Sequence, residues 1–236
     1  MNACNRSIVL SADHFGLDVV GYLHGYNGLL AQEYLVLGKD KVVNIIQLGG
    51  TILRSARCLE FKTEQAALLA ARNLDALAVE ALLVIGGDGS FRGAAHLTEH
   101  WSGQVIALPG TIDNDIQGSD ATIGYFTAIE TALESSDKVR DTADAFERIF
   151  LVEVMGRHAG FFGLSAAIAS ASDHVLVPEL CGDMETEIAN IISHLNTAKR
   201  TRGSASYIIV TTENIWPEGL THLAKILYEK TNIECR

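Results

Sequence analysis

The sequence predicts an α/β protein in which helices cover both faces of a parallel sheet. Apolar runs of strand length alternate with segments whose apolar residues recur at helical spacing, the order expected when a helix joins two parallel strands. Three of these runs end in sequences rich in glycine and charged residues, at 86–90, 109–115 and 155–160. Ligands of parallel sheets bind at the carboxyl ends of the strands, so these sequences are the first candidates for a site.

The strand predictions rest on short apolar runs bounded by glycine, proline or polar residues. Helical segments separate most of them, and the clearest is residues 63–80, where Thr63 and Gln65 suggest a variant capping box before a strand at 82–85. The runs are QEYLVLG (32–38), VVNIIQLGG (42–50), ALLVIGG (81–87), QVIALPG (104–110), RIFLVEVMG (148–156), DHVLVPE (173–179) and SASYIIVTTE (204–213).

Composition restricts the class of protein. The 236 residues are 48% hydrophobic and 20% charged, enough for one large domain or two smaller ones. A net charge of −11 without a basic run argues against nucleic-acid binding. The four cysteines show neither CxxC nor zinc spacing, and no apolar stretch reaches the ~18 residues of a membrane span. We therefore expect a soluble cytoplasmic protein with reduced thiols.

The first candidate loop is IGGDGS (85–90). Glycines let the backbone turn sharply and let phosphate oxygens approach amide N–H groups that a Cβ would obstruct. Asp88 adds a carboxylate suited to Mg²⁺, which reaches proteins through one or two carboxylates and the phosphates of a substrate. Ser90 is expected to cap the next helix. Taken alone, such a loop has a plain strand-to-helix turn as its alternative.

The second candidate is PGTIDND (109–115). If it is extended, Thr111, Asp113 and Asp115 lie on one side, and Ile112 and Asn114 lie on the other. Two carboxylates packed together are electrostatically costly unless a cation or a proton-transfer role justifies them. A solvated acidic loop is the alternative. The preceding apolar strand and Pro-Gly turn argue against it, because they set these acids at the mouth of a sheet.

The third candidate, VEVMGRHAGF (152–161), also leaves a strand and turns. It places Arg157 beside two glycines, and a planar guanidinium suits bidentate recognition of phosphate. His158 stays unassigned, because a histidine in such a position is more often a hydrogen-bonded structural residue.

In order and spacing, these three sequences resemble the bacterial-type ATP-dependent 6-phosphofructokinases. The resemblance runs over the whole chain and includes GGTILRSAR (49–57), YFTAIETALE (125–134), VRDT (139–142) and TTE (211–213). NAD kinases and diacylglycerol kinases share only the GGDG loop. The resemblance implies two Rossmann-like domains, one binding nucleotide (1–124) and one binding sugar phosphate (125–236). It also implies a glycolytic homo-oligomer, commonly a tetramer, with Mg²⁺ as cofactor and with ATP and fructose 6-phosphate as substrates.

The same resemblance implies roles for individual residues. Asp113 is the general base for the sugar 1-hydroxyl, while Asp88 holds Mg²⁺ with Asp115 nearby. Thr111 orients the transferring phosphoryl group, and Arg57 and Arg157 stabilise its charge. The residues implied to border ATP are Arg57, Cys58, Gly87, Asp88, Gly89 and Ser90. Those implied to face the sugar phosphate are Thr111, Ile112, Asp113, Arg148, Met155, Gly156, Arg157, Glu213 and Arg236, with Arg148 and Arg236 supplied across a subunit interface.

The phosphoryl donor follows from two glycines. Pyrophosphate-using relatives carry an aspartate and a lysine at the positions of Gly89 and Gly110. A carboxylate at position 89 would crowd the α-phosphate of a nucleotide, so the glycines favour ATP.

The chain departs from the family at its ends and at the effector site. It lacks the first strand with its glycine-rich loop and the C-terminal segment that carries a sugar-phosphate histidine and arginine. We therefore expect a fold truncated at both ends and little or no activity. A wrongly assigned start, a gene fragment and an artificial boundary stay open. Control by ADP or phosphoenolpyruvate is in doubt, because uncharged residues replace three effector-site cations. The replacements are Leu10, Leu48 and Ser204, and the retained cations are Arg6, Arg140 and Arg202.

The sequence also contains a candidate metal pair and allows an alternative function. HLTEH (96–100) places two histidines four residues apart, a candidate metal pair, but it is not HExxH and a solvated helix face is favoured. The alternative function is a non-catalytic remnant that serves as a structural or regulatory partner of a complete subunit. The intact acids and arginines favour the kinase.

Overall fold

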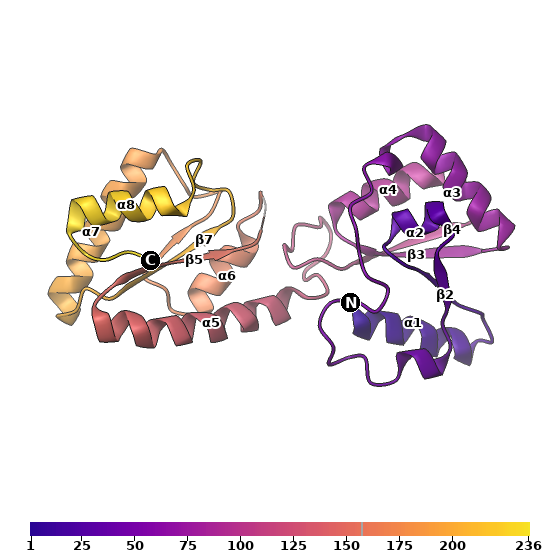
Figure 1. Ribbon diagram of the computed structural model, residues 1–236, viewed down its shortest axis with the longest axis horizontal. Helices are drawn as coiled ribbons and strands as arrows, with labels where there is room; N and C mark the ends of the chain where they lie inside the picture. The colour runs from indigo at the N-terminus through magenta and orange to yellow at the C-terminus, as the bar shows by residue number, and fades with distance from the viewer. Residues whose placement is uncertain (157) are drawn as a thin grey trace. The chain divides into compact units, whose positions relative to one another are not determined.

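The computed structural model describes residues 1–156 and 158–236. The chain divides into two compact units, Met1–Gly110 and Thr111–Arg236. Each unit combines helices with a parallel sheet, which confirms the predicted α/β class (Figure 1). Residues 111–124 group with the second unit. The division of ligand binding at residue 124 stays a prediction.

The first unit is built around a two-stranded parallel sheet of β3 and β4, in register from Ala81 opposite Gln104 to Gly86 opposite Pro109. Leu82 and Val105, neighbours in that register, pack on a core that includes Leu74 and Trp101. A second sheet pairs β1 with β2 antiparallel. The elements are α1 (Asn2–His14), β1 (Val20–Tyr22), α2 (Tyr26–Ala31), β2 (Tyr34–Val36), the 3₁₀ helices η1 (Lys39–Val42) and η2 (Glu60–Lys62), α3 (Glu64–Ala76), β3 (Ala81–Gly86), α4 (Asp88–Thr98) and β4 (Gln104–Pro109).

Helix α3 shows how the local sequence sets an element. The Thr63 hydroxyl oxygen accepts a hydrogen bond from the Ala66 N–H at 3.3 Å and caps the helix. The predicted capping box is absent, because Ala66 occupies the position three residues after Thr63 and has no side chain to return the bond. The helix then buries Ala70 and Leu74 and ends at Ala76, earlier than predicted.

One predicted strand is wrong. Residues 42–50 continue from η1 through turns and pair with no strand in the part of the chain that the structure describes. Only Val42 and Ile45 enter the core, where they pack with Val9 of α1, whereas the side chains of Val43 and Ile46 are 57% and 60% exposed. A strand requires a neighbour for its backbone N–H and C=O groups, and this run has none there. Strand β1 was not predicted, because three residues carry too short a pattern.

The second unit is built on a three-stranded parallel sheet in the order β5-β7-β6. Its central strand is buried at every residue. Figure 1 shows α7 and α8 over one face and α5 and α6 over the other. The elements are α5 (Tyr125–Phe146), β5 (Ile149–Val154), α6 (Phe161–Ala169), β6 (His174–Leu176), α7 (Met184–Arg202), β7 (Tyr207–Thr212) and α8 (Leu220–Thr231).

Side chains that point alternately to the two faces of this sheet pack against helices on both sides. Ile149 and Ile209 join a cluster with α7 and α8, whereas Val154 and Val210 join a cluster with α5 and α6. Each fully buried aliphatic side chain contributes about 1.5–3 kcal/mol to folding. The sheet is therefore held rigidly at its carboxyl edge, where the site residues begin. Within the described residues, no helix is both long and apolar enough to cross a bilayer.

Candidate functional site

The loop between β3 and α4 is shaped by glycine. Gly86 ends β3, Gly87 is the N-cap, and α4 begins at Asp88. A Cβ on Gly86 would lie 2.4 Å from the Ser90 hydroxyl oxygen, so only glycine allows this close approach. Ser90 is not the predicted cap. It lies in the first turn of the helix, and its N–H donates to the Gly87 carbonyl at 2.9 Å.

Asp88 stands at the amino end of α4, with half of its side chain exposed. Among the described residues it pairs with Arg92, whose Nε lies 2.9 Å from the carboxylate one helical turn away. Such an exposed pair contributes about 0.3–0.5 kcal/mol, which a divalent cation can readily replace. The first-turn N–H groups of a helix lack intrahelical acceptors, and the helix dipole favours negative charge there. The N–H groups of such a turn suit phosphate oxygens, and the adjacent carboxylate suits Mg²⁺.

Gly89 and Gly110, the two glycines that favour ATP as the phosphoryl donor, differ in their surroundings. A Cβ on Gly89 would meet nothing within 4 Å in the described chain, so the space beside it is open. A Cβ on Gly110 would lie 2.8 Å from side-chain atoms of Ile85 and Met1. Local packing therefore requires glycine at position 110 for a reason unrelated to any ligand.

Arg57 and Cys58 lie in irregular backbone between η1 and η2. Arg57 is exposed. Cys58 is half-buried and packs against the core cluster that contains Phe61 and Leu74. Their predicted contact with nucleotide stays a prediction.

The TIDND loop opens the second unit and is not extended. Its backbone bends, and Asn114 has a φ of +54°. Thr111 and Asp113 are nevertheless brought together: the Thr111 hydroxyl donates to the Asp113 carboxylate, and the Asp113 N–H donates to the same hydroxyl oxygen, both at 3.2 Å. Asp113 is buried, with 7% of its surface exposed, whereas Asp115 is exposed. The predicted extended alternation is therefore wrong, and its ground for grouping Asp115 with the other two is lost.

Thr122 closes this loop and was missed by the sequence analysis. Its hydroxyl donates to the Thr111 carbonyl at 2.6 Å, and its N–H donates to the Asn114 side chain at 2.9 Å. Ile112 packs on the cluster that contains Tyr125 and anchors the loop from the apolar side. These contacts position the Asp113 carboxylate. The left-handed residue Asn114 was a signal available in the sequence, because asparagine is enriched in that conformation.

The carboxyl edge of the second sheet brings three predicted residues together. Val154 of β5 lies opposite Thr212 of β7, and the Glu213 N–H donates to the Val154 carbonyl at 2.8 Å. Met155 and Gly156 follow directly on β5, and Met155 is 51% exposed. The sheet therefore places Met155, Gly156 and Glu213 side by side at one edge. Arg157, predicted to bind phosphate, lies outside the described residues.

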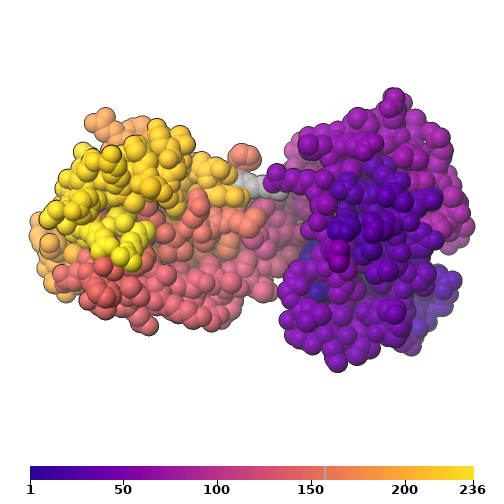
Figure 2. Space-filling view, viewed as in Figure 1, coloured from indigo at the N-terminus to yellow at the C-terminus, as the bar shows by residue number. Residues whose placement is uncertain are grey.

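Arg148 and Arg236 lie at the opposite end of the same sheet. Arg148 precedes β5, and the Arg236 N–H donates to the Ile149 carbonyl at 3.0 Å. Glu234 accepts from both guanidinium groups, from Arg148 at 2.6 Å and from Arg236 at 2.8 Å. The bonds from Arg236, followed by the charge of Arg148, lower the pKa of Glu234. Figure 2 shows the C-terminal residues on the surface of this unit.

Gly156 lies eight positions after Arg148, a span of about 26 Å if the chain between them is extended. One chain therefore does not bring these two arginines to the carboxyl edge of its own sheet. Their predicted role across a subunit interface stays a prediction.

Comparison with known proteins now places these features in a family. A family model described as Phosphofructokinase matches residues 1–236. The chain belongs to the phosphofructokinase family. It is 43% identical over 236 residues to ATP-dependent 6-phosphofructokinase 1 of Thermus thermophilus, and the match covers 100% of this chain and 72% of that relative. The family prediction from the three motifs is thus confirmed.

Solved structures agree with this phosphofructokinase fold. The crystal structure of Pichia pastoris phosphofructokinase in the T-state matches with a TM-score of 0.91 and 28% identity, covering 100% of this chain and 29% of that chain. A pyrophosphate-dependent phosphofructokinase from Marinobacter aquaeolei matches at a TM-score of 0.76 and 20% identity, covering 99% of this chain and 62% of that chain. The second match shows a shared fold alone.

The three arginines that the family resemblance predicts at an effector site all have partners within the protein. Arg6 donates to a carbonyl of η1 at 2.7 Å. Arg140 donates to two carbonyls at the end of α6, at 2.8 and 2.9 Å. Arg202 pairs with Asp173 at 2.5 Å. An effector phosphate would have to compete with these contacts.

Proposed function

We propose that this phosphofructokinase transfers the γ-phosphoryl group of Mg-ATP to the 1-hydroxyl of fructose 6-phosphate, giving fructose 1,6-bisphosphate and ADP. The observation that carries the proposal is the buried Asp113 carboxylate, held by the Thr111 hydroxyl at 3.2 Å in a loop closed by Thr122. A fixed carboxylate is the group needed to take a proton from an attacking hydroxyl.

The proposed chemical step uses that carboxylate as a base. The Asp113 carboxylate accepts the proton of the sugar 1-hydroxyl. The hydroxyl oxygen forms a bond to the γ-phosphorus of ATP, while the bond between the γ-phosphorus and the oxygen that bridges to the β-phosphate breaks and ADP leaves. Phosphoryl transfer depends mainly on positioning and charge neutralisation. The base therefore has to be correctly aligned, but it does not have to be strongly basic. Thr111 provides that alignment. Arg57 and Arg157 are proposed to stabilise the charge on the phosphoryl group.

The nucleotide is proposed to bind at the turn between β3 and α4. Asp88 would hold Mg²⁺, because its exposed carboxylate is the hard oxygen ligand this ion prefers. Bound Mg²⁺ supplies neutralisation of phosphate charge. The open space beside Gly89 accommodates a nucleotide phosphate, and Gly87, Ser90 and Cys58 border it. Residues 1–124 thus form the proposed nucleotide region.

The sugar phosphate is proposed to bind at the carboxyl edge of the second sheet, within residues 125–236, and at the TIDND loop before it. Met155, Gly156 and Glu213 converge there. Arg148 and Arg236, at the far end of the sheet, would serve a neighbouring subunit, which makes a homo-oligomer part of the proposal. We further propose a cytoplasmic location, as expected for a glycolytic enzyme.

ATP is expected to be the better phosphoryl donor. The support is the open space at Gly89 and the name of the 43% identical relative, an ATP-dependent enzyme. Initial rates with ATP and with pyrophosphate, each at saturating fructose 6-phosphate, provide the measurement. Gly89→Asp should raise the KM for ATP because its carboxylate would repel the α-phosphate. Faster turnover with pyrophosphate would contradict the steric argument.

Weak or absent regulation by ADP and phosphoenolpyruvate is expected as well. Leu10 and Leu48, with 36% and 53% of their surfaces exposed, offer no charge at two positions where the family places cations. Each lost charge-assisted hydrogen bond to phosphate costs about 1.5–3 kcal/mol. Rates against fructose 6-phosphate concentration, with and without each effector, test this. A strongly sigmoidal response that ADP relieves would show that other groups bind the effector.

The non-catalytic alternative makes the opposite forecast for the same assays. The deciding experiment uses a chain extended by the first strand with its glycine-rich loop and by the C-terminal segment, because the 236-residue chain is expected to show little or no activity under both hypotheses. An extended chain that folds and binds a complete subunit, yet shows no turnover with either donor, would favour the remnant over the kinase.

A further inference from the structure

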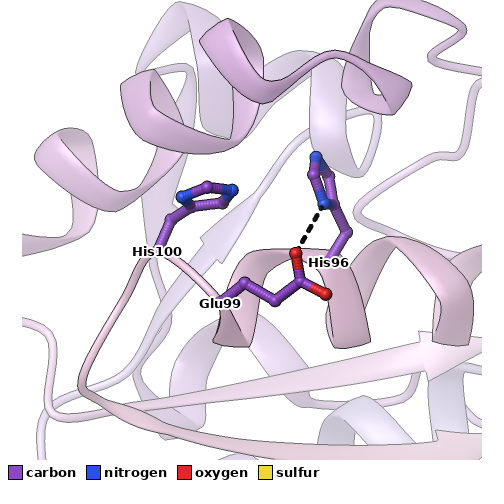
Figure 3. Close-up of side chains that lie close together, drawn as sticks. All are labelled: His96, Glu99 and His100. Carbon is purple, nitrogen blue, oxygen red and sulfur yellow. Dashed lines mark ion pairs between the residues drawn. The ribbon is translucent and has the colours of Figure 1, made fainter.

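Three potential metal ligands meet at the carboxyl end of α4. The donor atoms of His96, Glu99 and His100 all lie within 4.8 Å of one another. The Nδ1 atom of His96 is 3.6 Å from a carboxylate oxygen of Glu99. The two imidazole rings are 5.3 Å apart at an angle of 88°. Figure 3 shows all three side chains gathered on one side of the helix end.

The end of the helix explains why these three groups converge. The N–H groups of Glu99 and His100 donate to carbonyls three residues earlier, at 3.3 and 3.0 Å, so the last turn is tightened. Leu97 is fully buried in the core. Trp101 is 5% exposed, and its indole N–H donates to the Asp75 carboxylate at 2.9 Å. The ligand-bearing turn is therefore anchored at both ends.

Burial selects which nitrogen of His96 is available. The Nε2 atom is buried and has no hydrogen-bond partner in the described chain, whereas Nδ1 is the atom that faces Glu99. Glu99 has 70% of its side chain exposed and is free to adjust toward an ion. The partial negative charge at a helix carboxyl end also favours a cation.

We propose that His96, Glu99 and His100 bind a borderline divalent cation of the Zn²⁺ class through two imidazole nitrogens and one carboxylate oxygen. Tetrahedral Zn²⁺ with bonds of about 2.0–2.1 Å separates its ligands by about 3.3 Å. The three donor atoms, within 4.8 Å of one another, would reach this spacing by small movements of all three side chains. Water completes the coordination. Mg²⁺ is excluded from this site by chemistry, because it prefers oxygen ligands and gains little from imidazole.

This cation site is separate from the proposed nucleotide site. Asp88 and His96 are eight residues apart in one helix, about 12 Å along its axis. The inference therefore stands whether or not Asp88 binds Mg²⁺.

The test is a titration of the full chain with Zn²⁺ at neutral pH under a phosphine reductant, followed by calorimetry and by the thermal unfolding temperature. We expect one site and an upward shift of the unfolding temperature, since a ligand that binds only the folded state stabilises it. His96→Gln and His100→Gln should each weaken Zn²⁺ binding at least about 10-fold, because even outer-shell changes cost 10–100-fold. Glu99→Gln, at an exposed position, gives a variant whose folding is not at risk and should also weaken binding.

The matched control is His194→Gln. The Nδ1 atoms of His174 and His194 lie 3.4 Å apart and form the rival imidazole pair of this chain. Zn²⁺ affinity that falls with His194→Gln and survives Glu99→Gln and His100→Gln would overturn the proposal. The absorption spectrum of the protein with Co²⁺ in place of Zn²⁺ provides a second measurement. Visible d–d bands without a thiolate-to-cobalt charge-transfer band would support the site, whereas such a charge-transfer band would assign the ion to cysteine. Absence of Zn²⁺ binding by the folded chain would also overturn it.

Discussion

Asp113→Asn, in a protein completed with the two terminal segments that the family carries, is expected to lower kcat by about 10²- to 10⁴-fold, the usual contribution of a positioned base. The amide keeps the size of the side chain and can still accept from the Thr111 hydroxyl, but it cannot take the proton of the sugar hydroxyl. The KM for ATP should change little, because the carboxylate acts on the sugar and not on the nucleotide. Steady-state rates over a matrix of both substrates provide the measurement.

Asp120→Asn is the control for this change. Asp120 lies in the same loop and is exposed, and it accepts from Asn114 through its main-chain carbonyl, which the substitution leaves in place. Its kcat should match the unmodified protein. Near-normal turnover of Asp113→Asn, with Asp120→Asn also normal, would remove Asp113 from the chemical step.

Gly156→Ala is expected to reduce the free energy of unfolding by about 2–4 kcal/mol. Gly156 has a φ of +144°, and a Cβ there would lie 2.7 Å from the Ala159 carbonyl oxygen. That carbonyl belongs to backbone and cannot rotate away as a flexible side chain would. The energetic costs of the backbone strain and of the steric clash therefore add. The turn that presents the proposed sugar-phosphate residues should distort. Chemical denaturation followed by circular dichroism gives the stability, and the KM for fructose 6-phosphate should rise.

Gly203→Ala separates the two causes. Gly203 also has a positive φ, +72°, at the end of α7, but a Cβ there meets nothing within 4 Å in the described chain. Backbone strain alone should cost about 1 kcal/mol at this position. A Gly156→Ala variant no less stable than Gly203→Ala would show that the turn relaxes around the methyl group.

The local sequence was a good guide to the strands that pair in parallel. Ile149 to Val154 and Tyr207 to Thr212 appear as apolar runs because both faces of their sheet are covered. Strands β3 and β4 are also apolar runs, although Leu83 and Ile106 are 39% and 47% exposed. The run at 42–50 is equally apolar, yet it lacks a neighbouring strand in the described chain. Pairing depends on distant chain, so the same local pattern gave one wrong strand.

At the carboxyl end of α4, the positions of the side chains could not be predicted from residue spacing. HLTEH was interpreted as a solvated face, because spacing alone does not reveal that the last turn of α4 tightens and brings Glu99 to 3.6 Å from His96. The direction of a side chain at a helix terminus depends on how the chain leaves the helix. Here the exit is governed by the burial of Trp101 in the core.

By itself, the sequence determined the α/β class, the family and the loops that hold the candidate site, because strand periodicity, glycine turns and motif order are properties of neighbouring residues. Only the tertiary structure decided that Asp113 is buried against Thr111 while Asp115 is exposed, since Thr122 closes the loop from eleven residues beyond Thr111. It likewise decided that Arg236 lies near Arg148, since the Arg236 N–H donates to the Ile149 carbonyl and Glu234 accepts from both guanidinium groups. The physical reason is common to both: hydrogen bonds between distant residues and the direction of packed strands set which side chains meet, and neither is encoded in local spacing.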